Sequence, residues 1–113
     1  MRQGLQPRRL CGMAARILAD GRLGSGAVIA YRAGDRGAEV TRVRCVNQSA
    51  TPQTVVCKLA SSTPREFGRA ALAQYESVEF VEGAPIGLDA RQAIVLQTTD
   101  ADAVDFHVHG SEP

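Results

Sequence analysis

Two histidines near the end of the chain, His107 and His109, have the type and spacing that most directly suggest chemistry. Histidine is the commonest transition-metal side-chain ligand. On a β-strand, residues i and i+2 project from the same face about 6.5 to 7 Å apart, so two imidazoles can converge on one ion. A stable site needs further ligands, which Asp105, Asp100 or Asp102 would have to supply. Because the sequence has no third histidine, we expect no metal and no cofactor, and interpret both histidines as facing solvent or a neighbouring subunit.

Other motifs for catalysis are missing from the sequence. No Gly-x-Ser-x-Gly elbow occurs, and the glycine-rich stretch 21–26 lacks the lysine of a phosphate loop. The three cysteines, Cys11, Cys45 and Cys57, form no Cys-x-x-Cys pair that would suggest structural zinc. We interpret the last two as small buried hydrophobic residues that can lie near each other. The sequence therefore predicts a protein that is not an enzyme and has no small-molecule substrate.

Composition predicts one folded domain. The chain has 113 residues, 44% of them hydrophobic, with no Trp, two Tyr and three Phe. Aliphatic residues must therefore build the core, and Tyr31 and Tyr75 are the obvious aromatic residues for stacking on a sugar. Neither a secretory signal nor a membrane-spanning run is present, so we expect a soluble protein made in the cytoplasm, without a membrane partner.

Charge is unevenly distributed along a chain whose net charge is +1. Residues 1–16 carry four Arg and no acid, residues 17–75 have a net charge of +4, and residues 76–113 have a net charge of −7. Either these are scattered solvated side chains, or the molecule has a basic and an acidic side and docks head to tail on copies of itself.

The elements that must position the histidines are short strands separated by turn residues. In the last strand, Val104, Phe106 and Val108 share one face, and Asp105 lies with the histidines on the other. Residues 38–60 predict a hairpin. Residues 61–74, interrupted by Gly68, predict a long connection with room for one helical turn. The strands that we expect cover residues 15–19, 27–33, 38–46, 54–60, 75–81, 86–88, 93–99 and 103–110.

This spacing predicts an all-β fold: a single antiparallel β-sandwich, jelly-roll-like or immunoglobulin-like, with about seven or eight strands. We expect the domain to cover residues 13–113. Residues 1–12 are polar and basic, and we expect a flexible N-terminal arm or an upstream extension there. Its arginines, Arg2, Arg8 and Arg9, can contact phosphates without reading base sequence, but we expect them to contact a protein instead of nucleic acid.

Four stretches carry a resemblance to a known class of proteins. They are MAARILADGRLGSGAVIAYRA, VTRVRCVNQSATPQTVVCKL, LAQYESVEFVEGAPIGLDARQAIVLQTT and AVDFHVHG, which together span about residues 13–111. In pattern and order they resemble small β-sandwich structural proteins of tailed bacteriophages and prophages. The chain departs from that pattern at Arg91 and Gln92, where a glycine-containing turn is more usual, and in its basic residues 1–12.

The resemblance implies a structural subunit of a phage or phage-like particle, without catalytic residues. Such a protein would decorate the capsid or belong to the neck or tail, and would be found in the virion as an oligomer that contacts other virion proteins. The candidate contact residues in this chain are Arg2, Arg8, Arg9, Glu76, Glu79, Glu82, His107 and His109.

Two other functions are compatible with the residues. One is a carbohydrate-binding module, and the other is a small metalloenzyme built around His107 and His109. A further hypothesis concerns pH: if both histidines face an acidic neighbour, assembly tightens as the pH falls toward about 6, where imidazole gains charge.

Overall fold

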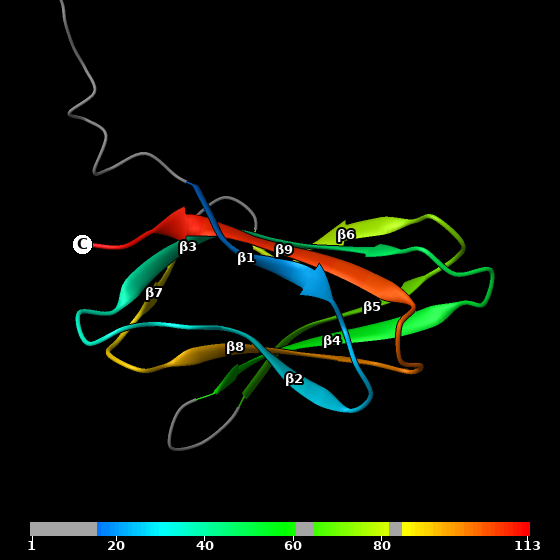
Figure 1. Cartoon of the computed structure of the whole chain (residues 1–113), viewed down its shortest axis with the longest axis horizontal. Coiled ribbons are helices and arrows are strands. Elements are labelled where there is room, and N and C mark those ends of the chain that lie inside the picture. Colours follow the sequence, from blue (N-terminus) through cyan, green and yellow to red (C-terminus); the bar gives the residue numbers. More distant parts are fainter. Residues whose placement is uncertain (1–15, 61–64, 82–84) are drawn as a thin grey trace, which may run out of the picture.

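We describe a computed structural model of the chain, which covers residues 16–60, 65–81 and 85–113. Throughout these ranges the chain is all-β, with nine strands in two antiparallel sheets packed face to face (Figure 1). In the same ranges no helix is long and apolar enough to cross a membrane. The predicted arm with Arg2, Arg8 and Arg9, together with Cys11 and Glu82, lies outside the described residues.

The strands are β1 (Arg16–Arg22), β2 (Ala27–Arg32), β3 (Ala38–Asn47), β4 (Gln53–Ala60), β5 (Arg65–Leu72), β6 (Ser77–Glu79), β7 (Ile86–Leu88), β8 (Ala93–Thr98) and β9 (Val104–Ser111). They form two sheets of five and four strands. Sheet A has the order β1-β9-β3-β6, and β7 also pairs with β3. Sheet B has the order β2-β8-β4-β5.

This strand order is that of a jelly roll. The first strand pairs with the last, β2 with β8, β3 with β6 and β7, and β4 with β5, so the chain is a long antiparallel ribbon that is wrapped once on itself. Wrapping places successive strands of the ribbon alternately in sheet A and sheet B. Of the two sandwich types expected from the sequence, the jelly roll is therefore the observed one.

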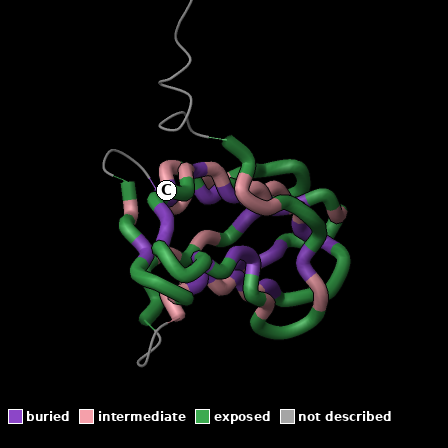
Figure 2. The backbone as a smooth tube through the Cα atoms, turned by 60° about the vertical axis from the view of Figure 1, so that its left-hand side comes forward, coloured by how far each residue is buried: buried purple, intermediate pink, exposed green. Residues whose placement is uncertain are grey.

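Alternating side chains build the core between the sheets, and Figure 2 shows the buried residues along the strands of both layers. In β9 the burial pattern alternates without a break: Val104, Phe106 and Val108 are buried, and the residues between them are partly exposed. The sequence prediction for this strand is thereby confirmed. Cys45 and Cys57 are also fully buried, as expected, and burial raises the pKa of both thiols, that of Cys45 to about 12.

Residues 65–72 form a full strand, β5, so the prediction of a long connection with a helical turn was wrong. The glycine that appeared to interrupt a helix has a packing role instead. A Cβ atom at Gly68 would collide with the ring of Phe80, which lies directly against the β5 backbone. Phe80 comes from the segment after β6, so this contact joins the two sheets. Adding β5 to the eight strands expected from sequence gives nine.

The predicted hairpin over residues 38–60 was also wrong. Both strands exist, but β3 lies in sheet A and β4 in sheet B, so the connection between them crosses from one sheet to the other. Asn47, fully buried at the end of β3, holds this crossing in place. Its side-chain amide donates to the carbonyls of Thr51, Leu72 and Ala73. The asparagine thus replaces the strand-to-strand bonds of a hairpin by bonds to two different loops.

The turn at residues 89–92 explains the departure noted in the sequence pattern. Arg91 has a φ of 65°, the left-handed conformation that favours glycine. Its side chain forms an ion pair with Asp35 at 2.7 Å, and its carbonyl accepts a hydrogen bond from Arg32. The Gln92 side chain accepts from the backbone N–H of Asp89. These contacts stabilise the turn without a glycine.

Candidate functional site

Both histidines lie on the outer face of sheet A, as predicted. Their ring centroids are 6.5 Å apart, with an angle of 43° between the ring planes. Since β9 is central in the sheet, each histidine has a cross-strand neighbour on either side. His107 lies between Asp20 of β1 and Arg44 of β3.

His109 lies at a point where both neighbouring strands are irregular. The register of β1 shifts between Ile17 and Ala19, and that of β3 shifts between Val40 and Arg42, so each strand holds one extra residue opposite the same part of β9. On β1 the bulge turns two successive side chains inward, and on β3 it leaves two successive side chains outside the core. Bulges re-aim side chains, and two of them flank His109.

The two bulges come close enough to require a glycine between them. A Cβ atom at Gly110 would collide with the carbonyl oxygen of Glu39 and would crowd the Leu18 side chain. The close approach of the Glu39 backbone therefore explains why the residue between His109 and Ser111 is a glycine. The irregular geometry thus restricts position 110 to glycine. Bulges that position side chains are typically maintained in this way.

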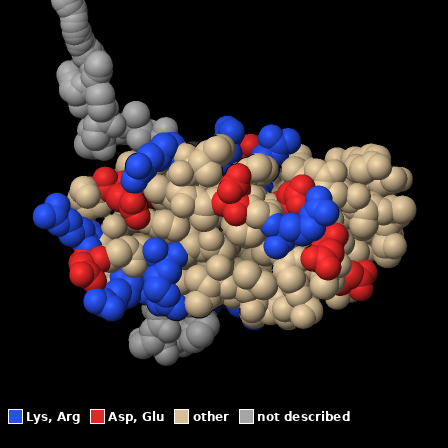
Figure 3. Space-filling model, in the orientation of Figure 1, with Lys and Arg blue, Asp and Glu red and all other residues tan. Residues whose placement is uncertain are grey.

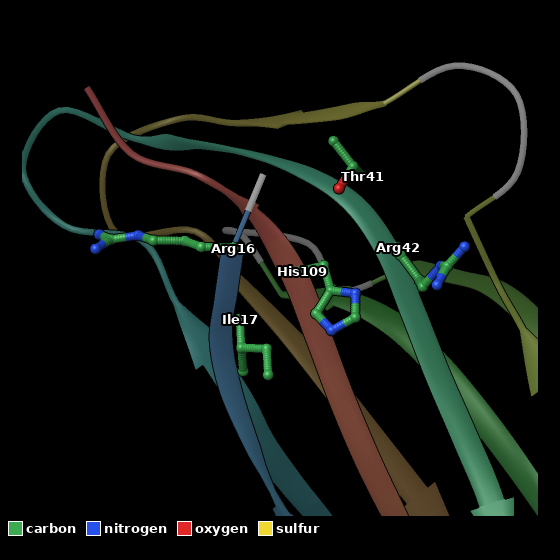
Figure 4. A pocket seen from close by; sticks show the side chains of 5 residues that line it. All are labelled: Arg16, Ile17, Thr41, Arg42 and His109. Atoms are coloured by element: carbon green, nitrogen blue, oxygen red, sulfur yellow. The ribbon is translucent and has the colours of Figure 1, made fainter. Parts of the chain in front are cut away.

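A hollow of about 490 Å³ lies at these bulges, and we call it the bulge hollow. Its lining residues are Arg16, Ile17, Thr41, Arg42 and His109. Figure 4 shows them on three adjacent strands, and the strand of His109, β9, lies between β1 and β3. Ile17 is 56% exposed, although it is a large aliphatic residue on a paired strand. The hollow is therefore lined by an exposed apolar side chain, an imidazole, a hydroxyl and two arginines, and Figure 4 shows the Arg16 side chain directed away from His109.

The acids near the histidines in the sequence are the candidates for further metal ligands. Asp105 lies on the same face, but Arg22 holds it through two hydrogen bonds of 2.7 and 3.3 Å. This contact, with a smaller contribution from His107, lowers the pKa of Asp105. Asp100 instead accepts a hydrogen bond from Gln53. Within residues 16–60, 65–81 and 85–113, no group of three or more His, Cys, Asp and Glu side chains is placed to hold a metal ion.

Ion pairs across the strands join the basic and the acidic parts of the sequence. Arg22 pairs with Asp105 at 2.7 Å and Arg42 with Glu79 at 3.3 Å. In both pairs the arginine comes from the first half of the chain and the acid from its last third. The ribbon topology interleaves the two segments, so much of the charge imbalance along the sequence is balanced within sheet A.

Glu112 links the two sheets near the end of the chain. It accepts a hydrogen bond from Arg16 of β1 at 2.9 Å and another from the hydroxyl of Tyr31 of β2. Burial, and then the contact with Glu112, raises the pKa of Tyr31 to about 12. Tyr31 is only 8% exposed, so it does not offer a ring for stacking on a sugar, whereas Tyr75 is 67% exposed.

The remaining contact residues predicted from sequence lie apart from one another. The carboxylate of Glu76 accepts the backbone N–H of Ala73 within a turn. Glu79 lies on the outer face of sheet A and is engaged with Arg42. The histidines and Glu79 therefore share one face, whereas Glu76 lies at an end of the molecule.

Sequence reasoning missed the bulge hollow, and one signal could have revealed it. In a regular strand, buried residues recur at every second position. Here the buried valines Val40 and Val43 are three residues apart, and Ile17, Leu18 and Ala19 form an apolar run without alternation. Both irregularities indicate bulges.

Comparison with known proteins supplies no relative for this site. No protein-family model matches the chain, and no curated protein matches it either.

Proposed function

We propose that the chain is a non-enzymatic structural subunit that acts through protein–protein contacts made by the outer face of sheet A, within a phage or phage-like particle. The observation that carries this proposal is the bulge hollow, where Ile17 is 56% exposed beside Arg16 and Arg42. Arginine and large apolar residues are typical of the parts of an interface that contribute most to binding.

The energetics of Ile17 favour a covered state. Moving an isoleucine side chain from exposed to buried stabilises a complex by about 1.5 to 3 kcal/mol at most, and a side chain that is 56% exposed would yield roughly half of that. Because the residue stands on a paired strand, little conformational entropy is lost when a partner covers it. The hollow is thus preorganised for a partner, and the two arginines beside it keep about half or more of their side-chain surface exposed.

Membership of a particle rests on two supporting arguments. The jelly-roll architecture recurs in viral capsid proteins, although it also occurs in lectins and enzymes, so the likeness is an analogy at the level of the fold. The sequence pattern over residues 13–111 resembles phage structural proteins as described above. Together these favour a virion protein over the carbohydrate-binding module, for which Tyr31 is buried.

Sedimentation of particles tests this function. The chain, or its Ile17→Asp variant, is expressed in the native bacterial host, the prophage or phage is induced, and the lysate is separated on a density gradient. We expect the natural chain to sediment with particles that contain packaged DNA or tail proteins, and Ile17→Asp to remain at the top of the gradient.

Ile29→Asp provides the matched control, because Ile29 is 52% exposed on β2, in the other sheet. This variant should sediment like the natural chain. The proposal fails if the natural chain never sediments with particles, or if Ile17→Asp and Ile29→Asp sediment alike.

A further inference from the structure

We infer that the bulge hollow receives the opposite end of a second copy of this chain, so that copies join head to tail. This inference rests on the proposed function, because it names the partner of the same site. The opposite end consists of the loops that carry Tyr75, Glu76, Asp100 and Asp102, and we call it the acidic loop end. The juxtaposition would bring an exposed aromatic ring and carboxylates to a hollow built of isoleucine and cations.

The chemistry of the hollow selects an acidic partner with an apolar or aromatic side chain. Arg16 and Arg42 each have one carboxylate neighbour, at 2.9 and 3.3 Å, but both keep about half or more of their side-chain surface exposed. Exposed arginines can bind a second carboxylate or stack on an aromatic ring. The Ile17 side chain adds an apolar surface that a charged partner alone would leave uncovered.

The acidic loop end has the complementary composition. Its connections, residues 23–26, 48–52, 73–76 and 99–103, contain three acids and no Lys or Arg. Arg22 lies near Asp102, but Asp105 already engages its guanidinium group. Tyr75 is 67% exposed, more than any other large hydrophobic residue in the described ranges.

Backbone hydrogen bonds hold the turns at this end. The N–H of Tyr75 donates to the carbonyl of Asn47 at 2.8 Å, and the N–H of Asp102 donates to the carbonyl of Leu23 at 2.9 Å. Tyr75 and Asp102 both have left-handed backbone conformations, with φ of 62° and 59°. The aromatic ring and the carboxylate are thus presented from fixed turns, which reduces the entropy lost on binding.

The bulge hollow lies on the outer face of sheet A, toward the end of the molecule that is opposite the acidic loop end. In Figure 1, β1 begins and β9 ends toward the left, and the residues that line the hollow come from these parts of the two strands and from β3; the connections β3–β4 and β5–β6 lie at the right. On the face that Figure 3 shows in the same orientation, most Lys and Arg side chains lie toward the left and top, with some Asp and Glu side chains among them. One molecule therefore cannot close this contact on itself. Repetition between copies gives a ring or an open chain, depending on the rotation between neighbours.

Two variants test the two surfaces one at a time without straining the backbone. Ile17→Asp places a carboxylate in the hollow. The double variant Tyr75→Asn and Asp102→Asn removes the ring and one charge from the loop end, and asparagine tolerates the left-handed conformation at both positions. Ile29→Asp serves as the control in sheet B. All proteins are used without tags, and their masses are measured by light scattering during size-exclusion chromatography over a concentration series.

We expect the natural chain and Ile29→Asp to form oligomers as the concentration rises, and each of the other two variants to associate about tenfold more weakly or not at all. Mixing those two variants is the decisive measurement. Each retains the surface that the other lacks, so a mixture should form a dimer with one copy of each and nothing larger. A symmetric contact, in which the same surface meets itself, would give no such dimer.

Three outcomes overturn the inference. A natural chain that stays monomeric at several hundred micromolar excludes self-association of useful strength. A mixture of the two variants that stays monomeric, while the natural chain forms oligomers, excludes the head-to-tail contact. If the Tyr75→Asn and Asp102→Asn variant behaves like the natural chain while Ile17→Asp no longer sediments with particles, the partner is another virion protein, and the proposed function stands without this inference.

Discussion

Replacing Asn47 should destabilise the fold more than any other single polar substitution described above. The side chain has no exposed surface. Its amide nitrogen donates to the carbonyls of Thr51, Leu72 and Ala73 at 2.9, 3.1 and 3.2 Å, and its oxygen accepts from the backbone and side chain of Ser49 at 2.9 and 2.8 Å. One residue thus satisfies backbone groups of two connections, β3–β4 and β5–β6, each of which crosses between the sheets.

The size of the effect follows from these contacts. In Asn47→Ala, several carbonyls lose their donor, and each buried polar group without a partner costs about 1 to 3 kcal/mol. Because Thr51 and Ala73 are exposed, water can satisfy part of what is lost. We therefore expect the free energy of unfolding to fall by about 3 to 5 kcal/mol, a large part of the roughly 5 to 15 kcal/mol that stabilises a typical domain.

Asn47→Asp tests the loss of the hydrogen-bond donors while the side chain keeps nearly the same shape. The carboxylate has nearly the same size, but it replaces the N–H donors by an oxygen that faces carbonyl oxygens. Burial and these neighbours should raise the pKa of the introduced carboxyl above its unfolded value of about 3.9. A raised pKa stabilises the protonated form in the fold, so the deficit relative to the natural chain should be largest near neutral pH and should shrink as the pH falls.

Urea denaturation followed by circular dichroism, repeated at several pH values, measures both effects. Gln74→Ala is the control, since Gln74 is exposed in the neighbouring turn, and it should change stability by less than about 0.5 kcal/mol. A loss below about 1 kcal/mol in Asn47→Ala would refute the assignment of Asn47 as the link between the loops. So would a deficit of Asn47→Asp that grows as the pH is lowered.

Three further predictions follow from packing and charge. Gly68→Ala should cost about 1 to 3 kcal/mol in urea denaturation because the added methyl group meets the Phe80 ring, and Phe80→Leu in the same chain should recover part of the loss; additive losses would contradict the packing argument. Because Arg22 lowers the pKa of Asp105, their contact stabilises the fold above the unfolded pKa of about 3.9 and is lost as the pH falls through the folded value. Arg22→Gln should therefore reduce the thermal midpoint at neutral pH but not at strongly acidic pH, and an equal reduction at both would exclude this linkage. The raised pKa of Tyr31, about 12, means that stability is lost as the pH rises from about 10 through that value, so Tyr31→Phe should flatten the alkaline limb of the stability profile.

The sequence predicted the fold where alternation is regular. In β9 each second residue is buried, and the pattern identified both the strand and the outward position of the histidines. The strands β2, β3, β4 and β8 were placed correctly to within a few residues because their β-branched and apolar runs lie between turn residues. The alternation of apolar and polar residues indicates which side of a strand is buried, and it depends only on residues of that strand.

Features that depend on distant parts of the chain could not be predicted from local patterns. The sequence NQSATPQ contains ordinary turn residues, and nothing in it says that Asn47 bonds to Leu72 and sends the next strand into the other sheet. Gly68 resembles a helix interruption until the Phe80 ring is placed against it. The bulge hollow requires that two irregularities, in β1 and β3, meet at the same residue of β9.

The ion pair between Arg16 and Glu112 has a practical consequence for engineering. This ion pair, at 2.9 Å, joins the start of β1 to the residue that follows β9. The two ends of the described chain therefore lie close together. A short linker across this pair, with new termini opened in the exposed turn at residues 35–36, should give a circular permutant that keeps every strand pairing. Such a permutant would move any fused cargo away from the first strand and display it from the turn that follows β2.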